Sequence, residues 1–204
     1  DTVPGPALPH GSIHPSPETL TGSNAGYDPK AELSGFAQLH TQGSGGITTY
    51  GTFLVSPQVG DPEFDETKHT SPKAGENAAA DLYAVTLSRY NIKAEVTPAH
   101  YAAMYRFSFP ESGQSDIVFD ITRKILGVMA SDNAEVTLDP ATGRLTGRVK
   151  AKDYWNPQAF DIWFVAELNV KPVAWGVFKG ADKQAGATHG TSGPDERLGA
   201  WWAF

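Results

Sequence analysis

Two short stretches of the sequence combine residue types that suit the binding of a sugar. In the first, His40 precedes a glycine-rich run at residues 43–46, with Ser44 and Gly45 at its centre. Glycine lets a backbone approach a ligand closely, and imidazole and hydroxyl groups offer hydrogen bonds. We therefore expect His40, Ser44 and Gly45 to contact a ligand. The alternative for His40 is a loop histidine whose ring is held by a backbone carbonyl.

The second stretch is Tyr154-Trp155-Asn156-Pro157, which lies between two predicted strands. The indole ring of a residue such as Trp155 can stack on the C–H face of a sugar, and the amide of a residue such as Asn156 can bind its hydroxyl groups. Because both stretches adjoin strand ends, we expect them to lie on the same edge of the fold and to form one shallow site. The alternative for Trp155 is a contact with another domain.

Other kinds of chemistry find little support in the sequence. The six histidines lack the spacings that bring several of them onto one metal ion. The glycine-rich run lacks the Gly-Lys-Ser/Thr ending of a phosphate loop, and a predicted strand follows it instead of a helix. Asp61, Glu63, Asp65 and Glu66 lack the spacing of a calcium loop, so we expect a solvated acidic loop there. The sequence thus assigns no metal site and no catalytic residue to this chain.

The elements that position these residues are predicted to be antiparallel strands. Aromatic and β-branched residues alternate with small or polar ones over residues 83–87, 92–96, 103–109 and 117–121. A period of two with one apolar side is typical of half-buried strands. Breaks fall at Tyr90-Asn91, at Pro98 and at residues 110–113, where turn chemistry or a missing N–H ends the ladder.

Further strands are expected along the rest of the chain. The sequence predicts a strand over 49–55 that ends at Ser56-Pro57, a hairpin of 136–138 with 145–149, a pair formed by 160–168 and 173–178, and a last strand from residue 198. Residues 1–30, 56–80 and 179–197 are predicted to be long loops. Trp163 and Trp175 fall within strand patterns, and we expect both in the core. The fold class is therefore all-β, a two-sheet antiparallel β-sandwich of ten or so strands with long Pro/Gly-rich loops.

Composition narrows the choice of partners. The 204 residues are enough to bury one full core, so residues 1–204 are interpreted as a single domain. The net charge of −7 comes without a basic stripe, which argues against binding to nucleic acid. No apolar run reaches the roughly 18 residues that span a membrane, and there is no cysteine to form disulfides. A neutral ligand such as a glycan suits this composition.

The order and spacing of several motifs resemble a known family. Residues 81–123 contain the patterns Y-x-V-x-L, Y-x-I-x-A-E-x-T and Y-R-F-x-F-P, residues 33–45 read LSGFAQLHTQGSG, and residues 160–172 read FDIWFVAELNVKP. With the Pro-Gly-Pro and Ser-Pro-Glu-Thr motifs of residues 4–19, they resemble the amino-terminal β-sandwich domain of glycoside hydrolase family 92, the exo-α-mannosidases. The similarity covers most of residues 4–204. It departs from the family at His10, where an aromatic residue is usual, and at residues 40–45, where the family reads His-Leu-Ser-Gly.

The resemblance implies an intact enzyme that is a secreted or periplasmic, calcium-dependent, inverting exo-α-mannosidase acting on a mannose-containing glycan. In that family the catalytic acid, the base and the Ca²⁺ ligands belong to a helical barrel domain that follows the sandwich. The mannose pocket lies at the seam between the two domains. The expectation for this chain is that it contributes loops to the pocket, holds no cofactor itself and has no hydrolase activity alone. The alternatives are a free-standing carbohydrate-binding module and a structural domain without a glycan role.

The carboxyl-terminal residues 198–204 are predicted to form an apolar strand whose faces other residues must cover. They are almost entirely apolar, and Trp201 and Trp202 must point to opposite faces of a strand. We expect this strand either to keep a large apolar face exposed or to be covered by a second polypeptide, because an uncovered apolar strand invites aggregation. In the resembling family, one more strand and a linker would follow.

Overall fold

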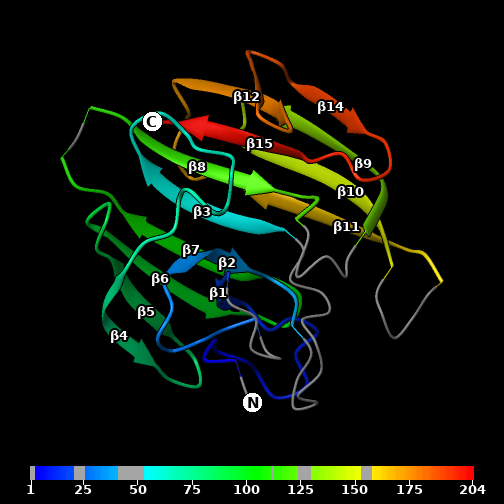
Figure 1. The fold of residues 1–204 in the computed structure, drawn as a ribbon. Helices are drawn as coiled ribbons and strands as arrows, with labels where there is room; N and C mark the ends of the chain where they lie inside the picture. Colours follow the sequence, from blue (N-terminus) through cyan, green and yellow to red (C-terminus); the bar gives the residue numbers. More distant parts are fainter. Residues whose placement is uncertain (1–2, 21–25, 41–52, 112, 124–129, 153–157) are drawn as a thin grey trace.

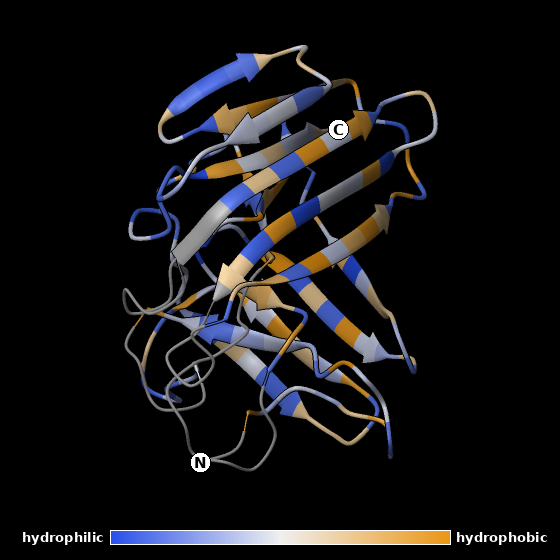
Figure 2. Ribbon diagram, turned by 90° about the vertical axis from the view of Figure 1, so that its right-hand side faces the viewer, coloured by the Kyte–Doolittle hydropathy of each residue, from blue (hydrophilic) through white to orange (hydrophobic). Residues whose placement is uncertain are grey.

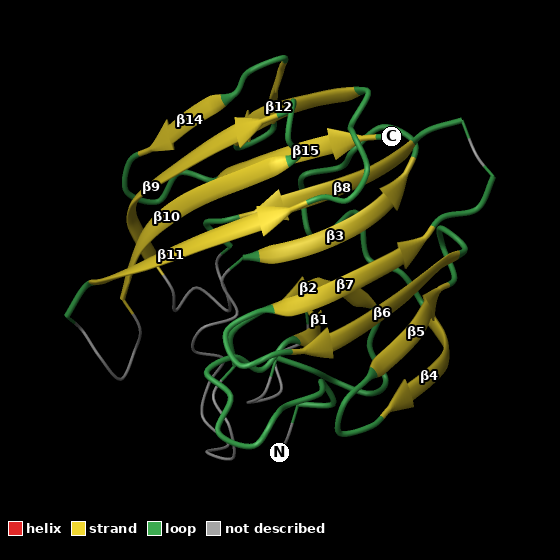
Figure 3. Ribbon diagram, turned by 180° about the vertical axis from the view of Figure 1, so that it is seen from behind, coloured by secondary structure: helices red, strands yellow, loops and turns green. Residues whose placement is uncertain are grey.

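The fold is seen in a computed structural model, which describes residues 3–20, 26–40, 53–111, 113–123, 130–152 and 158–204. These residues form fifteen strands in antiparallel pairs and contain no helix (Figures 1 and 3), which confirms the all-β class and exceeds the expected number of strands. The strands are β1 (Ser16–Thr19), β2 (Leu33–Ala37), β3 (Leu54–Val59), β4 (Lys73–Ala78), β5 (Tyr83–Leu87), β6 (Ile92–Pro98), β7 (Ala103–Ser108), β8 (Ser115–Asp120), β9 (Ala130–Asp139), β10 (Arg144–Lys152), β11 (Phe160–Glu167), β12 (Ala174–Lys179), β13 (Asp182–Ala185), β14 (His189–Ser192) and β15 (Leu198–Ala203).

The strands form three sheets in two layers. A seven-stranded central sheet has the order β1-β2-β3-β8-β15-β12-β13 and makes one layer. The other layer holds two four-stranded sheets, the β5 sheet (β4-β5-β6-β7) and the β10 sheet (β11-β10-β9-β14). The predicted sandwich is therefore present, with its second layer divided into two sheets. A long antiparallel sheet twists from edge to edge. Because of this twist, two short sheets can each pack on one part of the long sheet and follow its local direction.

Each of the two smaller sheets closes its own core against the central sheet. The main core lies between the β10 sheet and strands β8, β12 and β15, and includes Phe119, Val136 and Trp202. The second core lies between the β5 sheet and β2, with Phe36 and Tyr83 fully buried. Apolar and polar residues alternate along many of the strands (Figure 2), as expected where one face of a sheet packs on a core.

The strands predicted between residues 83 and 121 are confirmed as β5, β6, β7 and β8. Asn91 takes a φ of 52° in the turn between β5 and β6, a left-handed conformation that asparagine tolerates better than most residues. The β9–β10 hairpin is confirmed as well, and Gly143 supplies a φ of 72° in its turn. Local sequence thus determines these hairpins.

The predicted pairing of residues 160–168 with 173–178 is wrong. Strand β11 pairs with β10 in one layer, whereas β12 pairs with β13 and β15 in the other. The short connection crosses from one layer to the other instead of making a hairpin. Both strands still pack on the main core from opposite sides, with Phe164 and Trp175 partly buried against it. The prediction that Trp175 packs in the core is therefore confirmed.

Three segments predicted to be loops contain strands. Strand β1 lies within residues 1–30, β4 within 56–80, and β13 and β14 within 179–197. Strand β3 also continues through Pro57, where we expected it to end. Beyond Val55, β3 has a pairing with β8 and none with β2 in the described residues. A residue without an N–H is tolerated where one side of a strand is unpaired.

The carboxyl-terminal strand is covered within this chain, contrary to the expectation of an exposed apolar face. Strand β15 pairs with β8 on one side and with β12 on the other. Trp202 is 0% exposed in the main core, and Trp201 is 3% exposed on the opposite face. Phe64, from the connection between β3 and β4, stacks on Phe178 at 4.3 Å and belongs to the same cluster as Trp201. A distant segment of the same chain therefore supplies the cover.

Candidate functional site

A buried ion network joins four segments that lie far apart in the sequence. It consists of Glu18 in β1, His40 after β2, Glu66 before β4 and Arg123 after β8. The Nη1 of Arg123 donates to Oε2 of Glu18 at 2.6 Å, and its Nη2 donates to Oε1 of Glu66 at 2.6 Å. Only 3% of the Arg123 side chain and 1% of the Glu18 side chain are exposed. The guanidinium is thus clamped between two carboxylates away from solvent.

His40 completes the buried ion network from the other side of Glu18. Its Nδ1 donates to the backbone oxygen of His14 at 2.7 Å, and its Nε2 is hydrogen-bonded to Oε1 of Glu18. Both ring nitrogens of His40 are thus bonded inside the chain. The guanidinium of Arg123 pairs with both Glu18 and Glu66, and such pairing is what allows charged groups to stay buried.

The pKa values of Glu66 and Arg123 both shift so as to favour their charged forms. Burial by itself would raise the pKa of Glu66, but the guanidinium of Arg123 and the hydroxyl of Ser34 outweigh burial and lower it. Ser34 Oγ donates to Glu66 Oε1 at 2.6 Å. Burial alone would lower the pKa of Arg123, whereas Glu18 and Glu66 raise it above its ordinary value. The charged forms of Glu66 and Arg123 are therefore the stable ones at neutral pH.

The structure describes one of the five residues proposed for sugar binding. His40 is 4% exposed at its side chain, with both ring nitrogens bonded inside the chain. Ser44, Gly45, Trp155 and Asn156 lie outside the described residues, as do residues 41–46 and 154–157 in general. That the two stretches share one edge of the sandwich therefore stays a prediction.

Sequence reasoning missed the buried ion network because its partners are remote. Glu66 was expected in a solvated acidic loop, yet it is the buried partner of Arg123, 57 residues away. Glu18 and Arg123 are 105 residues apart. Asp61, in the same acidic stretch, is solvated as expected, with 91% of its side chain exposed. No local pattern distinguishes the two carboxylates.

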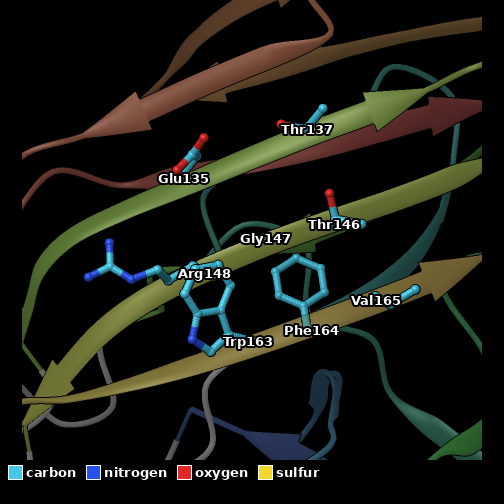
Figure 4. A pocket seen from close by; sticks show the side chains of 8 residues that line it. All are labelled: Glu135, Thr137, Thr146, Gly147, Arg148, Trp163, Phe164 and Val165. Carbon is cyan, nitrogen blue, oxygen red and sulfur yellow. The ribbon is translucent and has the colours of Figure 1, made fainter.

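Trp163 was also misplaced by its sequence pattern. It lies on β11 with 71% of its surface exposed, on the outer face of the β10 sheet. A shallow pocket there, shown in Figure 4, is lined by Glu135, Thr137, Thr146, Gly147, Arg148, Trp163, Phe164 and Val165. Alternation along β11 places Phe164 in the core and Trp163 outside, because successive side chains point to opposite faces.

Among the described residues, no group of three or more histidines, aspartates and glutamates is arranged to hold a metal ion. Within the same part of the chain, no helix has the length and apolar character needed to cross a membrane.

A separate buried carboxylate, Asp116 in β8, makes stability depend on pH. Burial raises its pKa from 3.8 to about 6, although Gln114 donates to both of its oxygens at 3.2 and 3.0 Å. The folded protein thus holds this proton more tightly than the unfolded chain does. The resulting stabilisation is complete below about pH 4 and is lost as the pH rises through about 6.

The substitution Asp116→Asn should remove this loss of stability at rising pH. Relative to the wild type, the variant is expected to gain roughly 2–3 kcal/mol in the free energy of unfolding between about pH 4 and pH 7, since one pKa unit corresponds to about 1.4 kcal/mol. Urea unfolding of both proteins across this range measures the difference. Parallel profiles for the two proteins would show that Asp116 does not titrate in this way.

Comparison with known proteins identifies the family of this chain. Residues 1–204 match the sequence model of the glycosyl hydrolase family 92 N-terminal domain. A family 92 inverting mannosidase from Bacteroides thetaiotaomicron VPI-5482 has a similar fold, with a TM-score of 0.84 and 24% identity over 100% of this chain and 26% of that one. A family 92 alpha-mannosidase from Bacteroides thetaiotaomicron, solved with mannoimidazole, gives a TM-score of 0.81 and 23% identity over 99% of this chain and 30% of that one.

A curated relative, an uncharacterized secreted glycosidase of Arthroderma benhamiae, is 27% identical over an alignment of 159 residues that covers 70% of this chain and 20% of that protein. The chain therefore spans less than a third of the length of each of these three proteins. The match of the family model extends over the whole sequence, and the fold agrees with it. The chain belongs to the glycosyl hydrolase family 92 N-terminal domain family.

Proposed function

We propose that this chain is the non-catalytic amino-terminal part of a secreted family 92 α-mannosidase. In this proposal a helical barrel domain supplies the catalytic acid, the base and Ca²⁺, and loops of the sandwich line part of the mannose pocket at the seam. The observation that carries the proposal is the family match over all 204 residues, combined with coverage of only 26–30% of two family 92 mannosidases of similar fold. The secreted location is supported by the relative from Arthroderma benhamiae, a secreted glycosidase.

The buried ion network supports a positioning role for His40 in this enzyme. Its ring is held by Glu18 and by the His14 carbonyl, so residue 40 is anchored at the start of the stretch that contains Ser44 and Gly45. Its ring nitrogens are engaged inside the chain, so we assign His40 to positioning that stretch instead of to direct contact with mannose. Small errors in the placement of binding groups lower enzymatic rates strongly.

The experiment compares the 204-residue chain with the longer enzyme. The chain alone is expected to release no mannose from 4-nitrophenyl α-mannoside, with or without Ca²⁺, because glycoside cleavage requires two facing carboxylates that we place in the barrel domain. The longer enzyme is expected to release mannose. In it, His40→Gln should lower kcat/KM by about 10- to 100-fold, with a raised KM for the mannoside.

The matched control is His189→Gln in the longer enzyme, because the His189 side chain is 54% exposed on β14. Its kcat/KM should stay at the wild-type value. Mannose release by the chain alone would contradict the proposal, and an unchanged kcat/KM for His40→Gln would contradict the positioning role. Should the isolated chain bind methyl α-mannoside as tightly as the longer enzyme does, a free-standing carbohydrate-binding module would be the better assignment.

A further inference from the structure

The outer face of the β10 sheet carries an exposed aromatic ring among polar side chains. Trp163 is 71% exposed and Val165 is 57% exposed, both on the edge strand β11. The strand register sets two rows of residues across β11, β10 and β9: Trp163, Arg148 and Glu135 in one, and Val165, Thr146 and Thr137 in the other. These six side chains line one shallow pocket (Figure 4).

The aromatic ring is held in place by its neighbours. The guanidinium of Arg148 lies 5.5 Å from the centroid of the Trp163 ring. Arg148 is itself fixed, because its Nε donates to Asp161 Oδ1 at 2.8 Å and its Nη1 donates to Asn133 Oδ1 at 3.1 Å. A fixed cation against the ring restricts its rotamers, so less entropy is lost when a ligand binds.

The floor of the pocket is anchored in the main core. A Cβ on Gly147 would lie 2.3 Å from the Phe164 ring, so only a residue without a side chain lets that ring sit beneath β10. Phe164 packs in turn on Phe53, with ring centroids 4.5 Å apart. The strands that carry Trp163 and Arg148 are therefore rigidly mounted.

We propose that this face binds one ring of a neutral glycan. The C–H face of the sugar lies on the indole of Trp163 and on Val165, while its hydroxyls bond with Glu135, Thr137 and Thr146. A neutral ligand fits because Asp161 already pairs with Arg148, with Nη2 and Oδ1 2.7 Å apart. The proposal uses no residue of the buried ion network and does not depend on the function proposed above.

The size and polarity of the face favour a sugar over a protein. Its exposed apolar part consists of the side chains of Trp163 and Val165, and charged side chains lie directly beside them. A stable protein interface buries roughly 800 Å² on each partner and is depleted of charge at its centre. One or two sugar rings need a much smaller platform, with hydrogen-bonding groups at its rim.

The test is affinity electrophoresis of the 204-residue chain in native gels that contain a dissolved polysaccharide. Neutral α-mannan, β-glucan and xylan are the probes, and polygalacturonate is the acidic comparison. We expect at least one neutral polysaccharide to retard the wild-type chain. Trp163→Ala should then weaken association about tenfold, through the loss of ring stacking.

The matched control is Tyr101→Ala, which removes an aromatic ring that is 83% exposed outside this pocket. Its retardation should equal that of the wild type. Equal urea midpoints show that each variant is folded, and Val165→Asn replaces Trp163→Ala in the assay if that variant fails this check.

Three outcomes would overturn the proposal. They are no retardation by any neutral polysaccharide, retardation by polygalacturonate alone, and equal retardation of the wild type and the pocket variant. A wild-type dimer in size-exclusion chromatography that Trp163→Ala converts to a monomer would assign the face to protein contact instead.

Discussion

Arg123→Met is expected to lower the free energy of unfolding by about 3–5 kcal/mol, the usual cost of removing one partner of a buried ion pair. The variant leaves the carboxylates of Glu18 and Glu66 inside the protein without the guanidinium that both accept from. Methionine fills much of the space of the arginine stem, so the loss comes mainly from uncompensated charge. Urea unfolding followed by far-ultraviolet circular dichroism gives the difference.

The matched control is Arg106→Met. Arg106 donates to Glu95 at 2.7 Å, but its side chain is 71% exposed, so water replaces the guanidinium when it is removed. Little change in the urea midpoint is expected, since exposed ion pairs contribute little to stability. If Arg123→Met were as stable as Arg106→Met, the buried ion network would have no structural role.

Trp202→Ala should cost about 3–5 kcal/mol of stability, the range measured when large aromatic residues are removed from cores. Trp202 is 0% exposed and packs between β15 and the β10 sheet in the main core. Its indole Nε1 has no hydrogen-bond partner among the described residues, so the loss is one of packing. The same urea experiment measures it.

Trp163→Ala tests whether burial, and not residue type, sets this cost. Trp163 is 71% exposed, so its removal should change the free energy of unfolding by no more than about 0.5 kcal/mol. Equal losses for the two tryptophan variants would mean that the assignment of Trp202 to the core and Trp163 to the surface is wrong.

Local pattern predicted the strands whose neighbours in sequence are also their neighbours in space. Strands β5, β6 and β7 follow one another as hairpins, so alternation and turn residues such as Asn91 were enough to place them. The β9–β10 hairpin was found in the same way from Gly143. In contrast, β4 and β13 are polar and largely exposed strands, and they carry no alternation that could distinguish them from loops.

Strand alternation shows that two faces exist, but not which face meets the core. Trp163 and Phe164 are adjacent in β11, and the sequence offers an aromatic residue to each face. The register with β10 decided the outcome, because Gly147 makes room for Phe164 on the inner side. With Phe164 on the inner face, Trp163 points to the outer face, where it is a candidate for ligand binding instead of a core residue.

The sequence by itself determined the all-β class, the hairpins and the membership in family 92, since each depends on residues close together or on the order of motifs along the chain. Only the tertiary structure decided the divided second layer, the cover over Trp201 and the buried ion network. The buried ion network alone joins segments up to 105 residues apart, as with Glu18 and Arg123. Charges so far apart in sequence leave no local pattern, because their pairing energy exists only once folding has removed them from water.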